Sequence, residues 1–112
     1  MPHEPHRASE GAADYAALRA LFDVLGRRWA LRVVWELGAG SMTYRELAAR
    51  APDMSTSVLT QRLRDLRTAG LVEHEQGAGY RLTSLGNDLL ARLMPLRAWA
   101  ERVEFGSGPA PR

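Results

Sequence analysis

Two short helical segments joined by a turn, each with its own start signal, lie in the middle of the chain. Thr43 is followed three residues later by Glu46, the spacing of a capping box, so a helix is expected from Thr43 to about Arg50. Ser55 is a good N-cap for a second helix, which ends at Gly70. The leucines of this second helix recur at helical spacing: Leu59, Leu63 and Leu66. Two short helices, the second capped and amphipathic, are typical of a helix-turn-helix.

A change of period after Gly70 predicts a β-hairpin. Residues 71–75 and 80–83 alternate between apolar and polar side chains, as strands do. They flank Gln76-Gly77-Ala78-Gly79, whose glycines permit a tight turn. A hairpin directly after a helix-turn-helix corresponds to the wing of a winged helix, and residues 41–43 can supply a further short strand.

Further helices are expected on both sides of this unit. Residues 14–25 carry apolar side chains on one helical face, and 29–37 form an almost wholly apolar segment that should be buried. A long helix is expected over 84–105, in which Pro95 should cause a kink or a break. The expected fold class is mainly α with a small β-hairpin wing (α+β), a winged helix-turn-helix with N- and C-terminal dimerisation helices.

The length of 112 residues leaves room for one domain with a modest core. Residues 1–13 lack periodicity and are expected to form a disordered arm. The domain is expected over 14–105, followed by a flexible tail over 106–112. Because a small core buries little surface, assembly into an oligomer is a plausible source of extra stability.

The composition argues against several kinds of chemistry. The sequence has no cysteine, which removes disulfides, thiolate nucleophiles, thiol redox switches and cysteine-bound zinc. It has no glycine-rich phosphate loop, metal-ligand cluster or catalytic carboxylate pair, so we expect neither an enzyme nor a cofactor. No apolar run reaches the roughly 18 residues of a membrane span, and no secretory signal is recognisable. We therefore expect a cytoplasmic protein without membrane contact.

Positive charge is concentrated in the middle third of the chain. The formal net charge is only +2, but residues 26–70 hold eight arginines against four acidic residues. Such a distribution suits a face that meets an anionic polymer. All fifteen basic side chains are Arg, which favours bidentate contacts with phosphate and guanine. A GC-rich genome would explain the same arginine content equally well.

The second helix of the pair carries polar side chains opposite its leucines. Those that lie together on a helical wheel are Ser57, Gln61, Arg64 and Thr68, with Thr60 and Asp65 beside them. Hydroxyl, amide and guanidinium groups are the ones that bind base edges in the major groove. The side chains expected to contact bases are Ser57, Thr60, Gln61 and Arg64. Because any solvated helix face carries such groups, the hypothesis depends on their place within a basic winged helix.

Five segments have the order and spacing of a known family. The most specific is Val58–Leu66, which reads Val-Leu-Thr-Gln-Arg-Leu-Arg-Asp-Leu. The others are Leu25–Leu31, Tyr44–Leu47, Ala69–Glu73 and Tyr80–Gly86. With these segments, about two thirds of the chain, from Leu25 to Trp99, resembles the HxlR-type winged-helix regulators, which are related to the MarR group.

The resemblance implies a homodimer whose two recognition helices enter successive major grooves of a pseudo-palindromic operator. Gln61 and Arg64 are implied to lie near bases. Arg45 and Arg62 are implied to lie near phosphates, although a salt bridge on the buried side is an alternative for Arg62. The full set expected at phosphates is Thr43, Arg45, Ser55, Arg62 and Arg81.

Two features depart from the family pattern. Many members carry a cysteine before the first helix that senses electrophiles or oxidants, and this chain has none. The hairpin is also short and lacks a basic, proline-rich tip. Glu73 and Glu75 flank His74, which we interpret as a surface strand residue, and Arg81 is the one basic residue of the hairpin. The wing is therefore expected to be a weak DNA contact.

The first and last helices carry more apolar surface than one small core needs, so a dimer that buries both is expected. The side chains expected at its interface are Leu18, Phe22, Leu89, Leu93, Leu96, Trp99 and Val103. The aromatic residues are interpreted as core or interface packing: Tyr15, Phe22, Trp29, Trp35 and Trp99. A pocket between the subunits for a small aromatic effector is the alternative interpretation of this aromatic set.

These patterns predict a sequence-specific DNA-binding transcriptional regulator whose partners are double-stranded DNA and a second copy of the chain. The alternative is a winged-helix protein-interaction module whose Arg-rich face binds an acidic partner. The mixture of Ser57, Gln61 and Arg64 favours DNA, because an acidic protein surface has no need of hydroxyl and amide groups.

Overall fold

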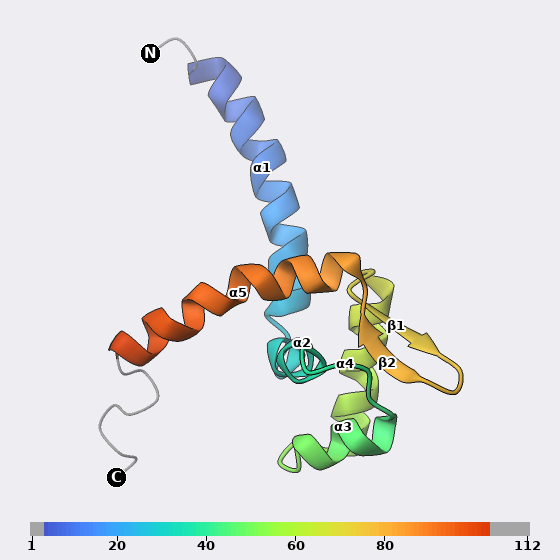
Figure 1. Cartoon of the computed structure of the whole chain (residues 1–112). Helices are drawn as coiled ribbons and strands as arrows, with labels where there is room; N and C mark the ends of the chain where they lie inside the picture. The colour runs from blue at the N-terminus through green and yellow to red at the C-terminus, as the bar shows by residue number, and fades with distance from the viewer. Residues whose placement is uncertain (1–3, 104–112) are drawn as a thin grey trace.

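The computed structural model describes residues 4–103, which form five helices and a two-stranded antiparallel sheet (Figure 1). In chain order the elements are α1 (Glu4–Leu25), α2 (Ala30–Leu37), α3 (Tyr44–Arg50), α4 (Thr56–Thr68), β1 (Val72–Glu75), β2 (Gly79–Leu82) and α5 (Ser84–Val103). This arrangement confirms the expected fold class, a mainly helical unit with a hairpin wing. Within the described range, none of the helices combines the length and apolar character needed to cross a membrane.

α1 begins at Glu4, well before the expected start near residue 14. Residues 4–13, expected as part of a disordered arm, are therefore helical in the structure. Pro5 stands in the first turn of the helix, where proline is tolerated. The alanines that follow have the highest helix propensity of all residues, so no apolar stripe is needed to continue the helix. The tail expected over 106–112 lies outside the described residues.

The core surrounds α2, which contacts the four other helices and β2. The most deeply buried large side chains of the core are Val33, Val34, Leu47, Leu59 and Leu66. The leucine stripe predicted for α4 is confirmed, because its three leucines are all buried. The expectation that α2 is buried all round is wrong for one side, where Leu31 and Trp35 remain more than a third exposed.

Both predicted helix caps of the helix-turn-helix are present. The Thr43 hydroxyl accepts a hydrogen bond from the backbone N–H of Glu46 at 3.1 Å, and the Glu46 carboxylate accepts one from the Thr43 N–H at 2.8 Å. Ser55 caps α4 by accepting from the Val58 N–H at 3.2 Å. The Tyr44 hydroxyl then donates to the Thr56 carbonyl at 2.8 Å, which fixes the start of α4 against α3.

The wing is anchored to the helix-turn-helix by a short third strand. β1 and β2 pair with Glu73 opposite Arg81, and Met42 forms an isolated bridge to Tyr80 with backbone hydrogen bonds of 2.9 and 2.7 Å. The strand expected over 41–43 is therefore confirmed as a bridge at Met42. Gly79, with φ of 95°, is required here, because a Cβ would lie 2.3 Å from the Met42 carbonyl oxygen.

α5 crosses the domain and packs its first half on the core. Leu89, Leu90 and Leu93 are half-buried against that core. The helix is unbroken through Pro95, so of the two outcomes expected there, a kink or a break, the break is excluded. The axis of α5 curves along its length in Figure 1. The C-terminal half of α5 and the N-terminal part of α1 both project away from the domain (Figure 1).

Candidate nucleic-acid interface

The polar face of α4, defined by Ser57, Thr60, Gln61, Arg64 and Thr68, is turned away from the core. Gln61 is half-buried and the other four side chains are exposed. This orientation follows from burial of the leucines on the opposite side of the helix. The helical-wheel prediction for α4 is therefore confirmed in its geometry, and the face presents hydroxyl, amide and guanidinium groups side by side.

A hydrogen-bonded chain orders the middle of this face. The Gln61 Nε2 donates to Asp65 Oδ1 at 2.8 Å, and an Arg64 NH group donates to Gln61 Oε1 at 3.2 Å. Both interactions lie along the helix at spacings that bring side chains together. Asp65 thus fixes the direction of the Gln61 amide, while Arg64, with five N–H donors, retains others for a ligand.

Arg62 lies away from the polar face. Its guanidinium forms a 2.7 Å salt bridge with Asp65 Oδ2, and Arg27, before α2, lies 3.5 Å from the same oxygen. The Arg62 side chain is only 17% exposed. The structure therefore shows the salt bridge that was the alternative interpretation of Arg62. The interaction of Arg27 with Asp65 connects α4 to the end of α1.

The other residues expected at phosphates lie at the starts of helices. Thr43, Arg45 and Ser55 are all exposed. The hydroxyl oxygens of Thr43 and Ser55 accept capping hydrogen bonds, so what each can offer a phosphate is its O–H proton. Contact of Thr43, Arg45 and Ser55 with phosphate stays a prediction.

Arg81, the expected wing contact, is occupied by carboxylates. Its Nε lies 2.6 Å from Glu73 and its NH1 lies 2.5 Å from Glu75. The hydrogen bond and charge of Glu73, followed by the charge of Glu75, raise the pKa of Arg81 above its ordinary value. The arginine is held charged but paired, so the two carboxylates leave this part of the wing with a net negative charge.

Sequence reasoning missed Asp65 as an organiser and Arg67 as a neighbour of the polar face. A groove of about 440 Å³ lies between the end of α4 and β1. Its lining residues are Arg64, Arg67, Thr68, Val72, Glu73 and His74. The spacing of three between Arg64 and Arg67 signals that both side chains reach one side of α4. His74 is exposed, as expected for a surface strand residue.

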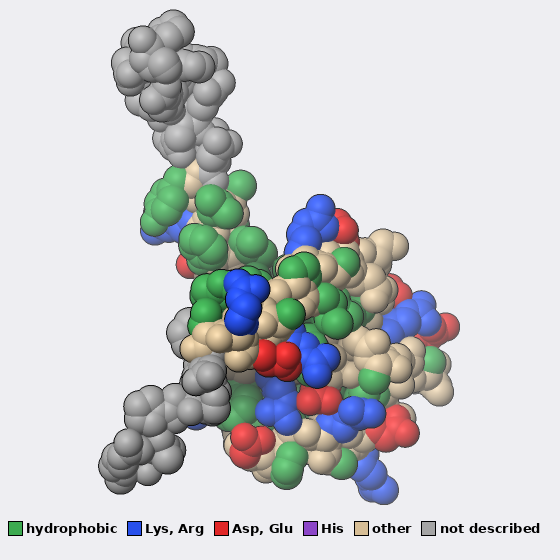
Figure 2. All heavy atoms as spheres, turned by 60° about the vertical axis from the view of Figure 1, so that its left-hand side comes forward, with side chains coloured by type: hydrophobic (Ala, Val, Ile, Leu, Met, Phe, Trp, Pro, Cys, Tyr) green, Lys and Arg blue, Asp and Glu red, His purple; other side chains and the backbone are tan. Residues whose placement is uncertain are grey.

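Exposed apolar side chains gather on α1 and on the outer half of α5. The expected interface residues that are exposed are Leu18, Phe22, Leu96, Trp99 and Val103. Leu89 and Leu93 instead pack partly on the domain's own core. Tyr15, which was interpreted as core or interface packing, is exposed on α1, as is Leu21, which the predicted interface did not include. Figure 2 shows the apolar side chains of α1 as a cluster on the projecting helix.

Comparison with known proteins identifies relatives over most of the chain. The family model described as HxlR-like helix-turn-helix matches residues 24–105. The uncharacterized HTH-type transcriptional regulator YvaP of Bacillus subtilis (strain 168) is 32% identical over 84 residues, covering 70% of this chain and 78% of YvaP. YodB, another HTH-type transcriptional regulator of that organism, is 28% identical over 91 residues, covering 76% and 81% of the two chains.

Solved structures agree with these sequence matches. Quinone-bound YodB from B. subtilis superposes with a TM-score of 0.72 at 29% identity, covering 78% of this chain and 98% of YodB. A possible HxlR family transcriptional factor from Thermoplasma volcanium GSS1 superposes with a TM-score of 0.69 at 27% identity, covering 75% and 81%.

Proposed function

Because the chain belongs to the HxlR-like helix-turn-helix family, and its relatives YvaP and YodB are named as HTH-type transcriptional regulators, we propose that it binds a pseudo-palindromic operator as a homodimer. The observation that carries the proposal is the polar face of α4. It is exposed, lies behind α3 and before the wing, and combines Ser57, Gln61 and Arg64 on one surface. These groups match the donors and acceptors of base edges.

The homodimer is supported by the surface of α1. Tyr15, Leu18 and Phe22 are 59, 47 and 56% exposed, and α1 projects beyond the body of the domain (Figure 1). A projecting helix with an apolar row gains stability only when a second surface covers it. A second copy provides an identical row, and a two-fold axis would pair the two rows with each other.

In the proposed complex, residues divide into those that read bases and those that hold the backbone. Arg64 is assigned to a guanine and Gln61 to an adenine, with Ser57 and Thr60 at neighbouring bases. The phosphate contacts are assigned to Thr43, Arg45 and Ser55. Arg81 joins them only if phosphate displaces Glu73 and Glu75.

The test is selection of bound sequences from a random pool of duplex DNA, followed by titration of the selected site at several salt concentrations. An inverted repeat with half-sites about one helical turn apart is expected. Affinity should fall by about 10³–10⁵ between 50 and 200 mM salt if the dimer meets roughly 6–10 phosphates. Recovery of no preferred sequence, with a flat salt response, would favour a protein-interaction module instead.

An effector of the proposed regulator cannot react with a cysteine thiol of this chain, because the chain has no cysteine. The solved YodB structure holds a quinone, which is a property of that protein. For this chain, the effector that we propose is a small aromatic molecule held by non-covalent contacts.

A further inference from the structure

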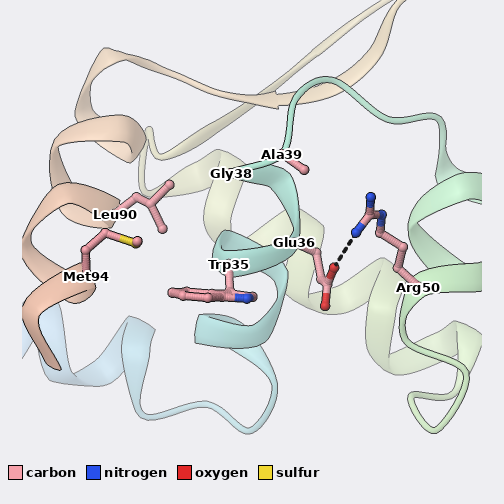
Figure 3. A pocket seen from close by; sticks show the side chains of 7 residues that line it. All are labelled: Trp35, Glu36, Gly38, Ala39, Arg50, Leu90 and Met94. Atoms are coloured by element: carbon pink, nitrogen blue, oxygen red, sulfur yellow. Dashed lines mark hydrogen bonds and ion pairs between the residues drawn. The ribbon is translucent and has the colours of Figure 1, made fainter. Parts of the chain in front are cut away.

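An open pocket of about 320 Å³ lies between the exposed side of α2 and the middle of α5, on a part of the domain that the polar face of α4 does not use. Its lining residues are Trp35, Glu36, Gly38, Ala39, Arg50, Leu90 and Met94. Figure 3 shows Leu90 and Met94 on one side, the Trp35 ring at the base and the Glu36–Arg50 pair on the opposite side. This volume is at the lower end of the range for small-molecule sites, so it suits a ligand of one or two rings.

One side of the pocket is apolar. Trp35 is 38% exposed and Met94 45% exposed, so both present apolar surface that a ligand could cover. The Arg97 guanidinium lies 5.7 Å from the centre of the Trp35 ring and holds it beside α5. Gly38 leaves room for α5, because a Cβ there would lie 2.6 Å from Leu90 Cδ2.

The opposite side of the pocket has an excess of positive charge. Glu36 is the acceptor for two arginines, with Arg32 Nε at 2.8 Å and Arg50 NH1 at 3.3 Å. One carboxylate against two guanidinium groups leaves a net charge of about +1 in this cluster. Arg50 makes the longer hydrogen bond and its side chain is 52% exposed, so it is the cation that a ligand can engage. Arg32, which is less exposed, also donates to the Arg50 carbonyl at 2.9 Å.

From this juxtaposition we propose that the pocket binds a small aromatic carboxylate, which deepens the proposed function by naming the chemical class of the effector. The ring stacks on Trp35 and packs against Leu90 and Met94, and the carboxylate accepts hydrogen bonds from the Arg50 guanidinium. Arg binds carboxylates with paired N–H donors in a geometry that a neutral amide cannot match. Charge complementarity at one end and aromatic contact at the other select this class over a neutral or cationic ring.

The proposal is tested on the full chain without DNA, so that its outcome is independent of operator binding. The probe is 2-naphthoate, titrated by calorimetry and by Trp fluorescence, with 2-naphthamide as the neutral control of the same shape. We expect one 2-naphthoate per chain, bound at least about tenfold more tightly than 2-naphthamide, because a hydrogen bond to a charged group is stronger than one between neutral groups.

Four variants separate this site from general binding to a basic surface. Arg50→Gln should remove the tenfold preference for the carboxylate, whereas Arg50→Lys should keep a part of it. Glu36→Gln should strengthen 2-naphthoate binding, because the ligand no longer competes with the Glu36 carboxylate. Arg92→Gln, which removes an exposed arginine of α5 outside the pocket, should leave both affinities unchanged.

Circular dichroism melts identify any variant that fails to fold. The comparison of 2-naphthoate with 2-naphthamide is made on the wild-type protein and therefore does not depend on the folding of any variant. The proposal is overturned if 2-naphthoate and 2-naphthamide bind equally, or if neither binds at millimolar concentration. It is also overturned if folded Arg50→Gln keeps the full preference for 2-naphthoate.

Discussion

Gln61 Nε2 and Asp65 Oδ1 lie 2.8 Å apart on α4, one turn from each other, so an acidic side chain holds the amide at the centre of the polar face. The other oxygen of Asp65 binds Arg62 at 2.7 Å. A single carboxylate therefore connects the proposed base-contacting side to the half-buried side of the helix. Loss of the Asp65 carboxylate should therefore change both the free energy of unfolding and the base preference in DNA binding.

Asp65→Asn should destabilise the domain by about 1–3 kcal/mol, because it leaves the 17% exposed Arg62 guanidinium without its carboxylate. Urea unfolding measures the difference. Asp88→Asn, which removes a carboxylate from a pair whose members are both mostly exposed, is the matched control and should cost under about 1 kcal/mol. Equal effects of the two variants would show that the Asp65 pair has no special structural role.

Freeing Arg81 should strengthen DNA binding by the wing. Glu73→Gln combined with Glu75→Gln removes both carboxylates from Arg81 and two negative charges from the surface of the wing. The affinity should rise, and the salt slope should steepen by about one unit for each additional phosphate that the wing binds. Adding Arg81→Ala to this double variant should abolish the steeper slope. A double variant with unchanged affinity and slope would mean that the wing does not approach DNA.

The proposed dimer depends on the apolar row of α1. Phe22→Arg should shift the protein to monomers at tens of micromolar, because it places a charge among side chains that the dimer would bury. Sedimentation velocity measures this shift. Ala20→Arg introduces the same side chain on the opposite side of α1 and should leave the dimer intact. A monomeric wild-type protein, or equal effects of the two variants, would contradict a dimer formed through this row.

Substitutions at two glycines of the wing distinguish the cost of backbone strain from the cost of steric overlap. Gly77 and Gly79 have similar φ values of 88° and 95°, but only at Gly79 would a Cβ meet the Met42 carbonyl oxygen. Gly77→Ala should cost about 1–2 kcal/mol from the left-handed backbone alone. Gly79→Ala should cost more, because the Met42–Tyr80 bridge must shift. Urea unfolding of both variants gives the comparison, and equal costs would mean that the close approach is relieved without any further penalty.

The helix-turn-helix could be predicted from the sequence because its signals are local. The Thr43 and Ser55 caps each involve residues three positions apart, and the leucines of α4 repeat with the helical period. The pairing of Arg81 with two glutamates depends on the register of the hairpin, which the sequence pattern did not specify. The Asp65–Arg27 interaction joins two elements distant in sequence, and no local pattern signals it.

The early start of α1 and the exposed side of α2 were mispredicted for the same physical reason. Apolar periodicity reports burial, and it says nothing about a helix that continues through alanine-rich sequence beyond the core. An apolar run such as that in α2 likewise does not reveal whether its outer side is covered by the same chain. The pocket beside Trp35 follows from that uncovered side and could not be seen in the sequence.

The central claim is that the polar face of α4 reads bases, and Arg64→Ala tests it most directly. The variant is titrated against the selected operator and each of its single-base changes, with Arg45→Ala at the start of α3 as the matched control. Arg64→Ala should cost about 1–3 kcal/mol per half-site and relax the preference at one base position. Arg45→Ala should weaken all sequences equally and lower the salt slope by about one unit for each phosphate that the variant no longer binds. If Arg64→Ala instead weakens every sequence equally and leaves base preference intact, the assignment of this face to base recognition is contradicted.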